Sequence, residues 1–147
     1  MSKKYLWIAL AIFHVAASAA GDDKRRGAEA ANSGHPAEAY RLWLPLAQSG
    51  DREVQESVAL LLASGQDIGV KLSRSERDSL TLAWVTRSAR NGQPSAMKWL
   101  AGAFEHGWMG LTKNDSASRC WAGAAGGERS TDECDKLSAV RPQSIAR

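Results

Sequence analysis

The sequence comprises 147 residues, of which 44% are hydrophobic, and it carries a formal net charge of +3. This length fits one small domain. Basic residues alternate with acidic ones along the chain, whereas nucleic-acid binding calls for a basic stripe on one face. We therefore expect no nucleic-acid partner.

Residues 1–20 have the pattern of a secretory signal peptide. Lys3 and Lys4 precede an apolar run over residues 5–15, and small residues at 18–20 form a cleavage site. The apolar run is shorter than the roughly 20 residues needed to cross a bilayer. We expect an exported, periplasmic or secreted protein without a stable membrane span, and removal of the two lysines lowers its formal charge from +3 to +1.

A tryptophan flanked four positions away on each side by small or apolar residues occurs three times. Three of the six tryptophans, Trp43, Trp84 and Trp121, lie in this pattern, and glycine follows each stretch. Positions i, i+4 and i+8 lie on one face of an α-helix. This pattern predicts three amphipathic helices that bury their tryptophans in the core.

A second repeated segment alternates with these helices. Residues 51–66 align without a gap onto residues 93–108, with apolar residues at helical spacing and glycine at the end of each. The repeating unit is thus a helix, a glycine-containing loop and a tryptophan helix. No strand-like alternation of useful length occurs in the sequence. We predict an all-α fold, a short α-solenoid of antiparallel helix pairs.

These residues resemble the Sel1-like repeat family, which is related to the tetratricopeptide repeats. The first half of the family pattern matches Ala96, Leu100, Phe104 and Gly107, and the second half matches Ala117, Trp121 and Ala125. The sequence departs from the pattern where Ala59 and Ala101 replace glycine. The resemblance spans residues 34–140, or two and a half repeats, and it implies an α-solenoid that binds proteins.

Four segments follow from this interpretation. They are a signal peptide at 1–20, an N-terminal capping segment at 21–35, a repeat domain at 36–140 and a flexible C-terminal tail at 141–147. The capping segment should cover the Trp43 helix, because an open-ended helical array needs caps.

Local signals mark several helix ends. Residues 130–133 (Ser-Thr-Asp-Glu) fit a capping box that opens a last helix over 132–140. Residues 75–78 have N-cap spacing for the Trp84 helix. Pro45 lies inside the Trp43 helix, where it should either kink the helix or start a new turn.

Cys120 and Cys134 are the only two cysteines. Export would place them in an oxidising compartment, and they stand at similar distances from the turn between two antiparallel helices. We favour a disulfide that fixes the terminal half repeat over a pair of free thiols.

The sequence offers no residues for catalysis, a metal or a cofactor. The histidines of the exported part, His35 and His106, lie at helix ends without further ligands at metal-binding spacing. Most carboxylates fall in first helical turns, where the helix dipole favours them. No nucleophile–base pair or phosphate loop occurs. We expect a protein that is not an enzyme.

The remaining aromatic residues suggest where a partner would bind. Trp99 aligns with Ser57, and Trp108 aligns with Gln66, so each replaces a polar residue of the sister repeat. They could be exposed anchors for a partner or could cover the thin core of the last repeat. If the family geometry holds, they line a groove together with Gln55, Glu56, Met97 and Lys98.

The resulting hypothesis is an exported Sel1-like adaptor or scaffold that docks a protein or peptide. One alternative is an enzyme acting on cell-wall material or β-lactams, as the resemblance to cysteine-rich relatives would imply. Another is a structural component that self-associates through its terminal helix.

Overall fold

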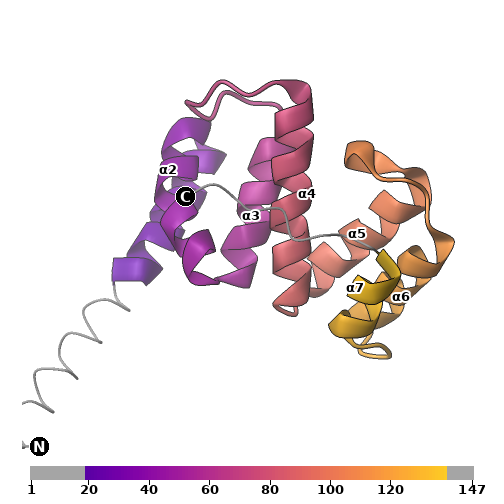
Figure 1. Ribbon diagram of the computed structural model, residues 1–147. Helices are drawn as coiled ribbons and strands as arrows, with labels where there is room; N and C mark the ends of the chain where they lie inside the picture. Colours follow the sequence, from indigo (N-terminus) through magenta and orange to yellow (C-terminus); the bar gives the residue numbers. More distant parts are fainter. Residues whose placement is uncertain (1–18, 139–147) are drawn as a thin grey trace, which may run out of the picture.

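A computed structural model describes residues 19–138 of the chain (Figure 1). Residues 19–32 form an N-terminal helical segment. The helices that follow are α2 (Pro36–Ser49), α3 (Arg52–Ala63), α4 (Arg74–Arg90), α5 (Pro94–His106), the short 3₁₀ helix η1 (Trp108–Gly110), α6 (Asp115–Ala125) and α7 (Thr131–Ser138). Residues 19–138 contain no strand, so the all-α prediction is confirmed. The predicted C-terminal tail and residues 1–18 of the predicted signal peptide lie outside the described residues.

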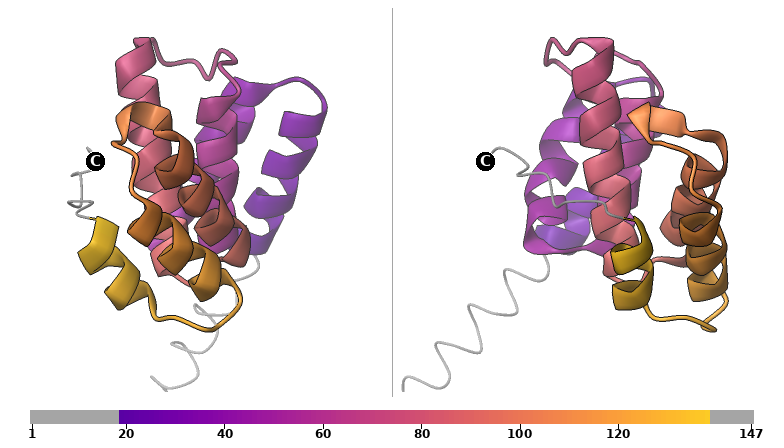
Figure 2. Two further views of the ribbon diagram at one scale, coloured as in Figure 1. Left: turned by 90° about the vertical axis from the view of Figure 1, so that its right-hand side faces the viewer. Right: turned by 45° about the vertical axis from the view of Figure 1, so that its right-hand side comes forward.

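Consecutive helices pack against one another from α2 to α7. Helix α4 is the centre of the arrangement, because it contacts α3, α5, η1 and α7. Figures 1 and 2 show α2 and α3 on one side of α4, and α5, α6 and α7 on the other. These neighbouring helix pairs are consistent with an α-solenoid.

The core follows the tryptophan pattern of the sequence. Trp84 and Trp121 are fully buried, and Trp43 retains only 8% of its surface. Each lies on its own helix: Trp43 on α2, Trp84 on α4 and Trp121 on α6. Apolar residues of α3 and α5 fill the space between them, namely Val54, Val58, Leu62, Ala96, Leu100 and Phe104.

The aligned segments 51–66 and 93–108 become α3 and α5 in equivalent register. Asp51 and Gln93 are the respective N-cap residues. Gly65 and Gly107 follow the helices with φ of 74° and 73°, a left-handed conformation that glycine adopts without steric cost. Both helices are therefore followed by a glycine with a similar left-handed φ.

Three local predictions need correction or refinement. The N-cap of α4 is Ser73 rather than Ser75, and Ser73 forms a reciprocal capping box with Glu76. Helix α2 continues through Pro45 without a break, so Pro45 does not split it. Helix α7 begins at Thr131, and the predicted end of that helix at Val140 lies outside the described residues.

The box predicted before α7 is only half formed within the described chain. The hydroxyl of Ser130 accepts from the Glu133 N–H at 3.2 Å, while the Glu133 carboxylate accepts from Arg129 at 2.6 Å. The nearby Arg129 guanidinium thus takes the place of the Ser130 backbone as the partner of Glu133.

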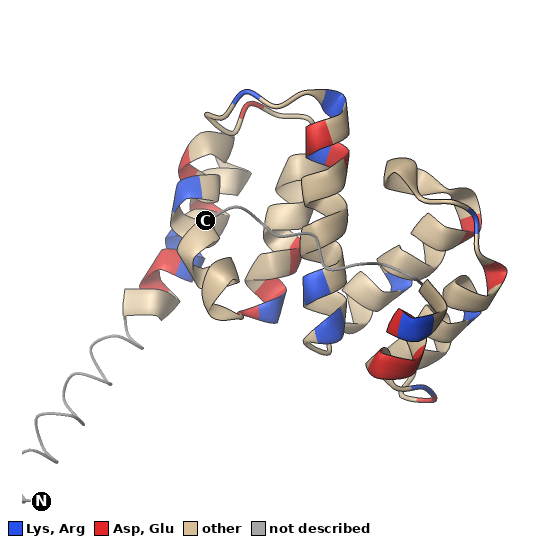
Figure 3. Ribbon diagram, in the orientation of Figure 1, with Lys and Arg blue, Asp and Glu red and all other residues tan. Residues whose placement is uncertain are grey.

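Figure 3 shows both basic and acidic residues on the helices, separated by long stretches that carry neither. No helix in the described part of the chain is both long and apolar enough to cross a membrane.

Candidate partner-binding site

Trp108 is the most prominent exposed aromatic residue of the described chain. It begins η1, directly after the glycine that ends α5, and 49% of its surface is exposed. Its ring centroid lies 4.9 Å from that of His106, with the planes tilted by 35°. A Cβ at Gly102 would lie 3.3 Å from Cζ3 of Trp108. The indole therefore lies across the surface of α5 at the position where a side chain is missing.

The residue after Trp108 has a strained backbone. Met109 adopts φ 55° and ψ 34°, which is uncommon for a residue other than glycine and costs on the order of 1–3 kcal/mol. Its side chain packs against the core, and η1 contacts both α4 and α5. Packing of Met109 thus holds the turn in a conformation that leaves Trp108 at the surface.

The other predicted partner-binding residues differ in their exposure. Lys98 is exposed. Trp99 is half-buried and packs against the core. The Glu56 carboxylate accepts from Gln93 Nε2 at 2.9 Å and Ser95 Oγ at 2.7 Å. Glu56 therefore joins α3 to the beginning of α5.

Two of the predicted groove residues are buried, so their assignment to an accessible groove is wrong. Gln55 is 1% exposed, and its amide donates to Ala47 O and accepts from Asn91 Nδ2, each at 2.9 Å. Met97 is buried in the core. The polar side chain of Gln55 is internal because those two bonds satisfy it between α2 and the end of α4.

The sequence analysis missed a hollow over Trp43. Its volume is about 250 Å³, and its lining residues come from the N-terminal helical segment, α2, α3 and the turn after α3: Ala31, Asn32, Trp43, Ser57, Leu60, Leu61, Ser64 and Gln66. Leu60 is 55% exposed. We call this space the Trp43 hollow.

The Trp43 hollow lies on the helix face that carries aromatic residues in the second repeat. In the gap-free alignment, Ser57, Leu60, Ser64 and Gln66 of the hollow correspond to Trp99, Gly102, His106 and Trp108. The same face is thus open on α3 and covered by aromatic rings on α5. The alignment of Trp99 with Ser57 was the sequence signal for this difference. It drew attention to the tryptophan on α5 but not to the open space at Ser57 on α3.

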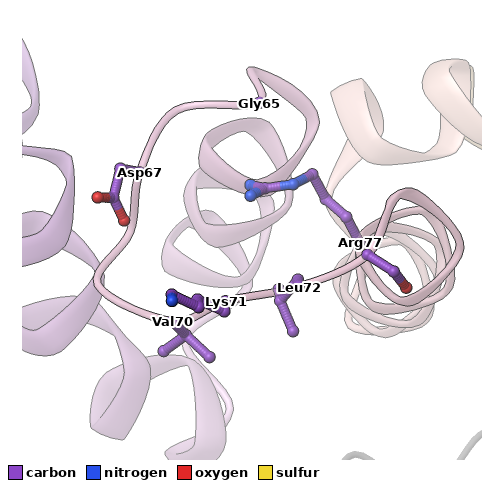
Figure 4. A pocket seen from close by; sticks show the side chains of 7 residues that line it. Gly65, Asp67, Val70, Lys71, Leu72 and Arg77 are labelled. Carbon is purple, nitrogen blue, oxygen red and sulfur yellow. The ribbon is translucent and has the colours of Figure 1, made fainter.

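A second hollow, of about 510 Å³, lies at the loop between α3 and α4 (Figure 4). Arg77 extends toward the chain after Gly65 in this view. Its Nη1 donates to Leu62 O at 3.3 Å and Gln66 O at 3.2 Å. The Asp67 carboxylate accepts from the Gly69 N–H at 2.9 Å. These charged groups hold the loop in place, and their interactions account for their positions without a ligand.

Cys120 and Cys134 form a disulfide that joins α6 to α7, with Cα atoms 5.3 Å apart. The predicted pairing is confirmed. Both cysteines are buried. Trp121 Nε1 donates to Ser138 Oγ at 2.8 Å, and Arg90 Nε pairs with Asp135 at 2.6 Å. The terminal helix is therefore fixed by a covalent bond and by polar contacts on both sides.

The shifted pKa values belong to groups with structural roles. Burial raises the pKa of Tyr40. Burial alone would raise the pKa of Asp51, but the Val54 N–H, the Lys24 ammonium and the Glu53 N–H outweigh it and lower that pKa. Hydrogen bonds from Ser73 lower the pKa of Glu76. Within residues 19–138, no group of three or more His, Cys, Asp or Glu residues could hold a metal ion.

Comparisons of the chain with protein-family models, curated proteins and solved structures find no match.

Proposed function

We propose that this chain is an exported, Sel1-like repeat protein that acts as a non-catalytic adaptor or scaffold in the cell envelope, with Trp108 as an anchor for a protein partner. The observation that carries the proposal is the placement of Trp108. It is half exposed on η1, supported by His106 and by the bare surface of Gly102. Exposed tryptophans on a rigid support are frequent energetic anchors in protein interfaces.

The fold and the disulfide support the same proposal. Packed helix pairs present side chains from successive helices on one continuous surface, which repeat proteins use for binding. The Cys120–Cys134 disulfide is compatible with an oxidising compartment and hence with export. The strained turn at Met109 is a feature that proteins retain mainly where it serves a function.

The test is an affinity capture from envelope extract under non-reducing conditions, with the full sequence expressed under its own leader and a C-terminal tag. We expect one dominant protein partner, identified by mass spectrometry, and loss of that partner with Trp108→Ala.

Val70→Ala is the matched control, because Val70 is a similarly exposed apolar residue (47%) on a different loop. Both variants should remain folded and show a cooperative urea unfolding transition. Retention of the partner by a folded Trp108→Ala variant would contradict the site, and an empty capture would contradict the adaptor function.

A further inference from the structure

We propose that the Trp43 hollow is a second binding site, which takes the side chain of a tryptophan or tyrosine from a protein partner. This inference rests on the proposed function only in requiring a protein partner, because the residues involved are different from those around Trp108.

The first argument concerns size and charge. The volume of about 250 Å³ is below the roughly 300–1,000 Å³ of typical small-molecule pockets, and therefore fits a single large side chain. All of its lining residues are uncharged. The Trp43 indole N–H already donates to Lys24 O at 3.1 Å, so Trp43 offers the hollow an apolar surface. An uncharged, largely apolar group complements these walls.

The second argument concerns hydrogen-bond polarity. The Ser57 hydroxyl donates to Glu53 O at 2.9 Å, and the Ser64 hydroxyl donates to Leu61 O at 2.7 Å. A hydroxyl has one proton and two acceptor lone pairs. Both serines have therefore used their donor and offer acceptors to the hollow, although the Gln66 N–H also approaches Ser64 Oγ at 3.4 Å.

A ligand that complements these acceptors must carry its own donor. The tryptophan N–H and the tyrosine O–H provide one on an aromatic ring, whereas phenylalanine and leucine provide none. A carboxylate would bring a charge into an uncharged site with acceptors facing it. Asn32 and Gln66 add amide groups that can both donate and accept. Among large, uncharged and mainly apolar side chains, tryptophan and tyrosine therefore complement the serine acceptors best.

The third argument comes from the sister repeat. On α5, the aligned face carries Trp99 and Trp108, and the Trp108 indole lies across Gly102, the counterpart of Leu60. The chain itself thus places indole rings on this face of the repeat. On α3 the aligned positions hold Ser57 and Gln66, which leaves the corresponding space open to a partner.

The experiment is a titration of the ¹⁵N-labelled full chain, followed by NMR. The probe is N-acetyl-tryptophanamide, and N-acetyl-phenylalaninamide is the comparison because its ring lacks a donor. We expect saturable shifts at the Trp43 indole N–H and at the amides of Ser57, Leu60 and Ser64. The phenylalanine probe should bind about fivefold more weakly, since one net hydrogen bond is worth about that factor.

Two variants test the polarity argument. Ser57→Ala combined with Ser64→Ala, which removes both acceptors, should weaken binding of the tryptophan probe about fivefold and abolish its advantage over the phenylalanine probe. Ser49→Ala should change neither, because Ser49 makes the same type of bond, to Leu46 O at 2.8 Å, at the end of α2 away from the hollow. Equal binding of both probes to the unaltered protein, or shifts confined to the surroundings of Trp108, would overturn the proposal.

The two proposals can fail separately. If the probe binds the hollow but no partner is captured, the hollow is an aromatic site, while the adaptor function and the assignment of the hollow to a protein partner both fail. If Trp108→Ala leaves probe binding intact, the hollow is independent of the first anchor. A second copy of the chain could instead insert its Trp108 into the hollow. A concentration-dependent dimer that is lost both with Trp108→Ala and with Ser57→Trp would show this, and it would overturn the assignment to a different partner.

Discussion

The two ends of the helical stack are closed by different means. At the N-terminal end, the segment of residues 19–32 docks on α2, where Trp43 donates its indole N–H to Lys24 O. At the C-terminal end, α7 docks on α6, where Trp121 donates its indole N–H to Ser138 Oγ. Each terminal helix therefore receives a hydrogen bond from a tryptophan of the preceding or following repeat helix.

The other contacts that hold the two terminal helices differ. A disulfide joins α7 to α6, whereas the N-terminal segment is held by close packing at Gly27 and by Lys24, which pairs with Asp51 at 3.0 Å and Glu53 at 2.7 Å. A short helical array can thus fix its terminal helix at one end by a covalent bond and at the other end by close packing and ion pairs. The proposed aromatic site lies at the noncovalent end.

The largest expected change in stability comes from removal of the disulfide between α6 and α7. Replacement of both cysteines, Cys120→Ala with Cys134→Ala, should lower the free energy of unfolding by about 3 kcal/mol, because the disulfide closes a loop of about 15 residues. Urea unfolding of both proteins would measure the difference. Addition of a reductant to the unaltered protein should reproduce it, and identical unfolding curves would show that α7 is held by its polar contacts alone.

The next effect tests the steric closure of the other end. A Cβ at Gly27 would overlap the indole nitrogen of Trp43 and lie 2.8 Å from Cε2. Gly27→Ala should therefore destabilise the protein by about 1–3 kcal/mol, the typical cost of overpacking, although alanine is the better helix former.

Gly21→Ala is the matched control, because Gly21 lies in the same helical segment and has no atom within 4 Å of the position of an added Cβ. This change should be neutral, or stabilising by up to about 1 kcal/mol. Thermal unfolding of the two variants measures the contrast. Equal stability of both would mean that the segment does not pack on Trp43 in solution.

The smallest effect concerns the ion pair at the N-terminal end. Burial lowers the pKa of Lys24, but hydrogen bonds and charges of Glu53 and Asp51 outweigh it and raise that pKa above its ordinary 10.5. The same cluster lowers the pKa of Asp51 below its ordinary 3.8. The contribution of Asp51 to the free energy of unfolding is present above the pKa of the unfolded state and is lost as the pH falls through the lower pKa of the folded state. The contribution of Lys24 to the free energy of unfolding is present below pH 10.5 and is lost as the pH rises through the raised pKa of the folded state.

Lys24→Met should therefore lower the free energy of unfolding at pH 7 by about 1 kcal/mol or less, because the pair is partly solvated. The difference from the unaltered protein should disappear in strong acid and at high salt. Arg25→Gln is the control, since Arg25 pairs only within its own segment, with Asp22 and Glu29, among the described residues. A Lys24→Met effect that does not depend on pH would show that it arises from side-chain packing.

The sequence predicted buried residues best where apolar residues repeat along one face of a helix. The tryptophan spacing identified Trp43, Trp84 and Trp121 as members of three helices, and all three are buried. It failed for Gln55 and Met97, which were placed on a groove and lie in the core. Periodicity assigns a side chain to a face, but contacts with other helices decide whether that face is open.

The sequence by itself determined the all-α class, the register of α3 with α5 and the pairing of the two cysteines. Local spacing and capping govern the helices, and two cysteines allow only one pairing within the chain. Tertiary structure alone decided that Gly27 makes room for Trp43, that Ala47 and Asn91 satisfy Gln55, and that Trp108 lies across Gly102. These features depend on atoms of different helices and turns that meet only in the folded chain, so helical spacing alone does not predict them. The Trp43 hollow is of the second kind, since three separate helices and a turn form its walls.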